Sequence, residues 1–147
     1  MYRFNLESLL RHRKFIEDAK QKELALIQGQ LNYELRQLMV LKEKLMQTVN
    51  EFKKRQSSNM RPQEFCMFRG YSFHLNKEIN EQQKTIEKVE KKVKIARSEL
   101  LSAVKDRKIL EKLKEKRKKE FLREKAISEQ KLTNEAAVAQ YNRKKNR

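Results

Sequence analysis

The chain has 147 residues, and its 37 Lys and Arg side chains outnumber 20 Asp and Glu side chains, leaving a formal net charge of +17. Charged residues make up 39% of the sequence and hydrophobic residues 37%, with two Gly, one Pro and no Trp. This excludes a compact domain, which at this length needs a thick apolar core and many turns. Apolar residues nevertheless recur with a helical period. Abundant Lys, Glu, Leu, Arg and Gln are typical of long helices and coiled coils.

The start of the sequence and its cysteine content favour the cytoplasm. Arg3 and Glu7 interrupt the first ten residues, so no secretory signal is expected there. No apolar run exceeds four residues, so we expect no membrane-spanning segment. Cys66 is the only cysteine, which excludes an internal disulfide and suits a reducing compartment. We therefore expect a soluble, cytoplasmic protein.

A seven-residue spacing of apolar side chains predicts a first helical arm over residues 3–56. The heptad column contains Leu10, Glu17, Leu24, Leu31, Leu38, Leu45 and Phe52, followed at three or four residues by Ile27, Leu35, Leu41 and Val49. A seam sustained over several heptads has to pack against another helix. Pro62 lacks an amide hydrogen and disfavours helical geometry at Arg61, so the first arm ends before it.

A second seam predicts a second arm over residues 71–140, joined to the first by a bend at 57–70. Its members, spaced mostly by three and four, are Leu75, Ile79, Gln82, Ile86, Val89, Val93, Ala96, Leu100, Ala103 and Leu110. Inside the bend, either Pro62 opens a single helical turn before a turn at Gly70, or Gly70 belongs to a continuous helix. The sequence leaves both alternatives open.

One interruption between two such arms predicts an all-α fold, a long antiparallel two-helix coiled-coil hairpin in a single elongated domain. The second arm is the longer one, and residues 141–147 are expected to fray. The expected facing pairs are Leu45 with Leu75 or Ile79, Leu31 with Val89, and Leu24 with Ala96.

The seam becomes basic towards the open end of the predicted hairpin. Its positions there are Arg107, Lys114 and Arg117, with Arg13 on the first arm. Like charges in a seam cost stability, so this end is expected to splay or to need a partner. Beyond Phe121 the second arm has apolar residues with no counterpart in the first arm.

The residues do not predict catalysis. His12 and His74 lie on different arms, and neither has a Cys or a carboxylate at metal-ligand spacing. Two isolated glycines cannot form a glycine-rich phosphate loop. We therefore expect no enzymatic activity, no metal and no cofactor.

Two features favour binding instead. The basic run over residues 112–119 fits an acidic protein surface, although glutamates at helical spacing make a plain solvated helix face an equal interpretation. The aromatic stretch Phe65, Phe68, Tyr71 and Phe73 exceeds what the end of a two-helix hairpin can bury. At least one of these rings is expected to contact a partner, and the alternative is that they only cap the hairpin.

Short motifs at both ends of the chain are shared with a known family. The start contains Phe4-Asn5-Leu6-Glu7-Ser8-Leu9-Leu10, Arg13-Lys14 and Glu17, and the end contains Glu129-Gln130-Lys131, Glu135 and Tyr141-Asn142-Arg143-Lys144. These stretches resemble the opening and closing segments of the flagellar export protein FliJ family. Asn134 departs from the family pattern, in which an aspartate is expected before the glutamate. The likeness covers essentially the whole chain, including its single break.

The resemblance implies a non-enzymatic component of the flagellar type III protein export apparatus, with a role in motility. Family members are antiparallel coiled coils similar to the stalk of rotary ATPases, and their open end inserts into the hexameric export ATPase and promotes its assembly. We expect this chain to be a monomer. The opposite end contacts the membrane export gate, and export chaperones are further partners. The resemblance also implies a place at the cytoplasmic face of the inner membrane, at the flagellar base.

Site residues follow from the same resemblance. The gate contact falls on Tyr71 and Leu75, with Phe65, Phe68 and Phe73 as further candidates near the bend. The ATPase-facing residues are Arg13, Arg107, Lys114, Arg117 and Phe121.

Two other functions fit the same sequence. A basic coiled-coil module would bind nucleic acid or anionic lipid head groups through its charge, with a steep dependence on salt. Nucleic acid is not expected, because no aromatic platform accompanies the basic run. The other is a structural homodimer, in which two extended chains pair and Pro62 is only a kink. A monomer mass from light scattering would exclude it.

Overall fold

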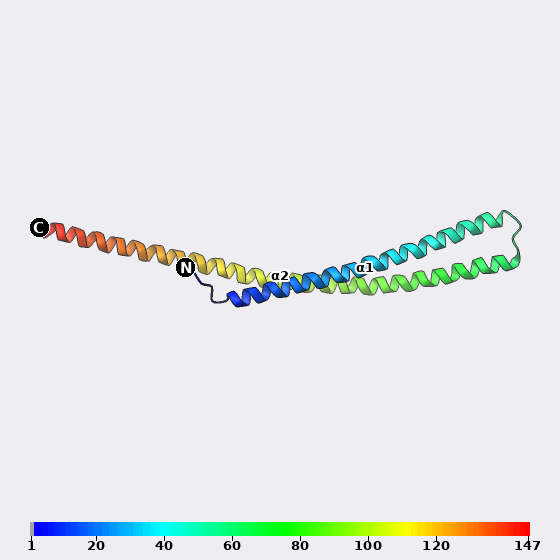
Figure 1. The fold of residues 1–147 in the computed structure, drawn as a ribbon, viewed down its shortest axis with the longest axis horizontal. Coiled ribbons are helices and arrows are strands. Elements are labelled where there is room, and N and C mark those ends of the chain that lie inside the picture. The colour runs from blue at the N-terminus through cyan, green and yellow to red at the C-terminus, as the bar shows by residue number, and fades with distance from the viewer. Residues whose placement is uncertain (1) are drawn as a thin grey trace. The chain divides into compact units, whose positions relative to one another are not determined.

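The computed structural model describes residues 2–147 and contains two helices, α1 over Glu7–Gln56 and α2 over Pro62–Lys145 (Figure 1). Within residues 2–147 there is no strand, and no helix is both long and apolar enough to cross a membrane. The prediction of an all-α fold with two helices packed against each other, the second longer than the first, is confirmed.

Both helices contribute to two compact units. Unit 1 consists of Met1–Asp18 and Ser102–Arg147, and unit 2 consists of Ala19–Leu101. The short connection between the helices belongs to unit 2, at the turn drawn in green in Figure 1.

In unit 2 the helices are held together by an apolar seam. The buried side chains of α2 are Leu75, Ile79, Ile86, Val89, Val93 and Ala96, all of them predicted seam members. Burying one aliphatic side chain of the size of Val, Leu or Ile contributes about 1.5–3 kcal/mol. The seam is therefore the main stabilising feature of unit 2.

The pairing of the helices in unit 2 is antiparallel. Contacts that advance along α1 move backwards along α2, through the pairs Lys20–Glu99, Glu34–Gln82 and Phe52–Phe68. The predicted pairs Leu24–Ala96, Leu31–Val89 and Leu45–Leu75 have the same register. Of these six residues, none is exposed.

Two predicted seam members of α1 are wrong. Leu35 and Val49 are exposed, whereas Glu34 and Thr48, one residue earlier in each case, are at least partly buried. Strict alternation of three and four residues from Leu31 leads to these polar positions. The sequence reading favoured the neighbouring apolar side chains and so moved the seam by one residue.

Hydrogen bonds explain why polar residues are tolerated in the seam. Gln82 Nε2 donates to the backbone carbonyl oxygen of Glu34 at 2.9 Å and also to the Glu34 carboxylate. Thr48 Oγ1 donates to the carbonyl oxygen of Lys44 at 2.8 Å. Buried polar groups are costly only when they lack such partners.

The connection between the helices is shorter than the predicted bend and covers residues 57–61. Pro62 is the first residue of α2, where its missing N–H is not needed and its fixed φ suits a helix. The Phe65 N–H donates to the Arg61 carbonyl oxygen at 3.2 Å. Helix α2 then continues through Gly70, so the continuous-helix alternative is the correct one.

The outer ends of the helices also differ from the predicted bounds. Helix α1 begins at Glu7 instead of residue 3, and the Glu7 N–H donates to the Phe4 carbonyl oxygen at 3.2 Å. Helix α2 continues to Lys145, through most of the segment predicted to fray. No Pro or Gly follows Gly70, and basic side chains in the last turn suit the negative end of the helix dipole.

Candidate functional surfaces

Unit 1 is joined by charges and aromatic rings more than by an apolar seam. Arg107 Nε donates to Glu17 Oε2, and Arg107 Nη1 donates to Glu111 Oε2 at 2.8 Å. Glu17 belongs to the predicted heptad column of the first arm, so this ion pair occupies a seam position. The hydrogen bond to Glu17 raises the pKa of the Arg107 guanidinium, and the bond to Glu111 adds to the effect.

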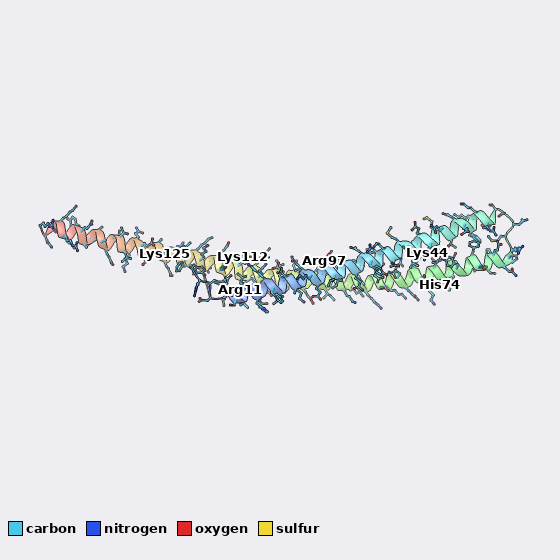
Figure 2. The ribbon with its side chains drawn as sticks, viewed as in Figure 1. Arg11, Lys44, His74, Arg97, Lys112 and Lys125 are labelled. Atoms are coloured by element: carbon cyan, nitrogen blue, oxygen red, sulfur yellow. The ribbon has the colours of Figure 1, made fainter. Side chains whose placement is uncertain are left out.

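Two further ion pairs connect the start of α1 to α2. Arg13 Nη1 lies 3.4 Å from Asp106 Oδ2, and Lys114 Nζ lies 2.8 Å from Glu7 Oε2. The hydrogen bond from Lys114 lowers the pKa of the Glu7 carboxyl group. Arg11 and Lys112, labelled in Figure 2, mark the segments of α1 and α2 that these contacts join.

Aromatic contacts extend this pairing to the residues that precede α1. Phe4 is buried, and the guanidinium carbon of Arg117 lies 5.8 Å from the centre of its ring. The Tyr2 and Phe121 rings have centroids 5.4 Å apart. A cation over an aromatic face is stabilised by the ring quadrupole.

The expectation that like charges would splay this end is therefore wrong. Each basic seam residue meets a carboxylate or an aromatic ring, and the partners are Glu7, Glu17, Asp106 and Phe4. The informative signal was Glu17, which interrupts the apolar heptad column.

All five candidate ATPase-facing residues lie in unit 1, and the structure brings them together along one pairing. Each has a partner within the chain: Arg13 with Asp106, Arg107 with Glu17, Lys114 with Glu7, Arg117 with Phe4, and Phe121 with Tyr2. Their side chains thus fix the N-terminal segment onto α2.

The free surface of unit 1 lies further along α2. Every residue from 122 to 147 is exposed, and we call residues 122–145 the overhang. Lys125, labelled in Figure 2, lies on it. Its large apolar side chains are Leu122, Ile127, Leu132, Val138 and Tyr141, all more than half exposed.

In unit 2, residues 52–77 form the end of the hairpin, which we call the tip. The Phe52 ring lies between Phe65 and Phe68, with centroids 5.7 Å away in both cases. This cluster borders an open cavity of about 310 Å³ lined by Val49, Phe52, Phe65, Phe68, Arg69 and Ser72. Two rings of the aromatic stretch, Phe65 and Phe68, thus pack against Phe52 of the opposite helix.

The two residues of the predicted gate contact differ in exposure. Tyr71 is 47% exposed, whereas Leu75 is 2% exposed and belongs to the core of unit 2. Leu75 therefore supports the tip from inside and offers no surface to a partner. Phe73 is exposed, and so is Met67, which sequence reasoning missed although it lies one helical turn before Tyr71.

Residues 2–147 contain no group of three or more His, Cys, Asp or Glu side chains placed to hold a metal ion. His74 Nε2 lies 3.0 Å from Glu78 Oε1, one turn along the same helix. Cys66 is exposed.

Exposed apolar side chains thus lie on the overhang of unit 1 and at the tip of unit 2. The chain matches the family model described as Flagellar FliJ protein over residues 2–146. It belongs to the flagellar FliJ protein family, as the motifs at both ends predicted. No curated protein and no solved structure is significantly similar to it. The chain is thus a component of the flagellar export apparatus.

Proposed function

We propose that this chain is a non-enzymatic, monomeric stalk that couples the hexameric export ATPase to the membrane export gate. The observation that carries the proposal is family membership over residues 2–146, supported by exposed apolar side chains in each unit. The two proposed contact surfaces are the overhang and the tip. Export chaperones are further partners in this proposal.

The proposed ATPase-binding surface is the overhang of unit 1. Its large apolar side chains are more than half exposed, and such side chains are the usual anchors of a protein interface. Arg13, Arg107, Lys114, Arg117 and Phe121 support this surface by holding the N-terminal segment on α2. Other basic residues of unit 1, such as Lys116, Lys118 and Lys119, give it the positive potential that would steer it to an acidic ring lumen.

The proposed gate-binding surface is the exposed part of the tip at Tyr71, with Met67 one helical turn before it and Phe73 exposed on another face of the helix. Leu75, Phe65 and Phe68 hold this surface in place by packing in or beside the seam. The location that follows is cytoplasmic, at the inner face of the membrane that contains the gate.

Truncation tests the ATPase half of the proposal. A chain ending at Glu124 loses most of the overhang but keeps every ion pair of unit 1. We expect it to stimulate phosphate release by the export ATPase much less than the full chain does. The comparison variant is Arg107→Met, which disturbs the pairing of unit 1 and leaves the overhang complete, so it should lose less stimulation than the truncated chain does. Full stimulation by the truncated chain would contradict the proposal.

A tyrosine comparison tests the gate half. Tyr71→Ala should weaken pull-down of the export gate protein and reduce swarming, with unchanged circular dichroism. Tyr33 is 53% exposed on α1 of the same unit, so Tyr33→Ala is the matched control and should bind normally. Equal losses for both variants would remove Tyr71 from the proposed contact.

A further inference from the structure

The solvent side of the first turns of α2 is unusually apolar for this chain. Met67 and Phe73 are each 74% exposed, and Tyr71 and Phe65 are also open to solvent. No charged residue lies between Arg69 and Lys77, whereas charges recur every few residues through most of α2. The tip thus presents large apolar side chains that the fold leaves in water, at a cost that a partner could remove.

The tip is also strongly basic. It contains the basic residues Lys53, Lys54, Arg55, Arg61, Arg69 and Lys77 and one acidic residue, Glu64. Arg55 Nη2 donates to both Glu64 carboxylate oxygens at 2.9 Å, so that carboxylate is already neutralised. Glu51 and Glu78 border the tip on either side, and six basic residues against these two and Glu64 still leave an excess of positive charge. The remaining basic residues belong to the same short segment as the exposed apolar side chains, and Glu51 and Glu64 lie beside Met67 and Tyr71.

Basic side chains in the same segment as exposed aromatic and methionine side chains match the two layers of an anionic lipid surface. Lys and Arg bind the phosphate layer while their neighbours insert into the boundary of the acyl chains. A nucleic acid would match the charges but would offer no apolar layer for Met67 and Phe73. We propose that the tip docks on anionic phospholipid head groups. This inference goes beyond the proposed function, because it assigns the tip a lipid ligand besides the gate protein.

Vesicle co-sedimentation with the full chain tests the inference. We expect the chain to sediment with vesicles of phosphatidylglycerol and phosphatidylcholine in equal parts, but not with phosphatidylcholine alone. Met67→Ser combined with Phe73→Ser should lower the partition coefficient at least tenfold. Lys54→Gln and Arg69→Gln should each lower it about fivefold, the effect of one basic group near a charged surface.

Matched controls decide whether the tip is specific. Ile95 and Leu101 of unit 2 are 60% and 58% exposed, so Ile95→Ser with Leu101→Ser removes similar apolar surface outside the tip. Lys91→Gln and Lys94→Gln are the charge controls. Binding that is retained by these controls and lost by the tip variants supports the inference, with circular dichroism confirming the helices.

Three outcomes would overturn it. The first is absence of sedimentation with the anionic vesicles. The second is an equal loss for tip and control variants, which would mean that only total charge matters. The third is tip variants that lose the gate protein in a pull-down while vesicle binding is unchanged, which would make the tip a protein site alone. A failed gate pull-down with intact vesicle binding by the wild-type chain would instead count against the proposed function only.

Discussion

The two units use the same pair of helices but hold them together by different forces. Unit 2 buries a long row of aliphatic side chains, with the hydrogen-bonded pair Glu34 and Gln82 at one position within it. Unit 1 keeps a few buried apolar residues, such as Leu10, and relies on partly exposed ion pairs and rings for the remainder. Burial in unit 2 depends little on salt, whereas exposed charge pairs are screened by it.

The difference shows that the seam positions of one heptad pattern can be aliphatic in one part of a helix and charged in another. Where aliphatic residues occupy the seam, the pairing of the helices is expected to depend little on the salt concentration. Where Arg107 and Glu17 occupy it, salt is expected to weaken the pairing by screening the charges. The variants below break or sharpen this contrast.

The largest effect is expected from the core of unit 2. Leu75→Ala removes a side chain that is 2% exposed, and such truncations cost about 2–4 kcal/mol of unfolding free energy. Urea unfolding followed by circular dichroism measures this loss. Leu101→Ala, at an exposed position of the same helix, should change stability by less than about 0.5 kcal/mol. A stability close to wild type for Leu75→Ala would mean that the seam does not dominate unit 2.

An intermediate effect of opposite sign is expected at Gly70. It lies inside α2, its backbone has no positive φ, and a Cβ there would meet no atom within 4 Å. Gly70→Ala should therefore raise the unfolding free energy by about 1 kcal/mol without altering the seam. Gly29→Ala, equally unobstructed in α1, is the parallel case. A loss of stability in either variant would mean that the helix is not continuous there.

A smaller effect is expected from Arg107→Met. The change leaves Glu17 and Glu111 without their shared cation, so hydrogen exchange should accelerate in residues 2–18 but not in 19–101. The effect should shrink in high salt, where wild-type ion pairs are screened as well. Equal acceleration in both units would show that the pairing of unit 1 is not local.

The smallest effect is a shift in the response of unit 1 to acid. Lys114 holds the pKa of Glu7 below its usual value of 4.5, so Glu7 stabilises the folded state fully above about pH 4.5. That contribution is lost as the pH falls through the lowered folded-state pKa. Glu7→Gln should remove this part of the acid dependence of exchange in residues 2–18. An unchanged pH profile would mean that the Glu7–Lys114 pair does not form in solution.

The sequence predicted the seam of α2 because Val89, Val93 and Ala96 repeat at heptad spacing whatever surrounds them. It failed at Glu34, because this residue is paired with Gln82 on the opposite helix. It also failed at Thr48, whose hydroxyl group is satisfied within α1 by the Lys44 carbonyl oxygen. It also failed at the start of unit 1. There the pairing is decided by the geometry of long side chains such as Arg107, and heptad spacing carries no information about that geometry.

The sequence could predict that aromatic side chains would be exposed near the bend, but it could not predict which of them. An aromatic excess near residue 68 correctly indicated exposed rings, since a helix offers one buried stripe. Which rings are exposed depends on whether one continuous helix runs from Pro62 through Gly70. The sequence left that question open. Phe73 and Tyr71 face water, while Leu75 is buried.

The loop at residues 57–61 has a consequence for assembly. By tethering both halves of the seam within one polypeptide, it gives them an effective concentration on the order of millimolar, whatever the abundance of the protein. Association of unit 2 therefore does not depend on a second molecule. A coiled coil made this way remains closed on dilution to a few copies per cell, at which a noncovalent dimer would dissociate.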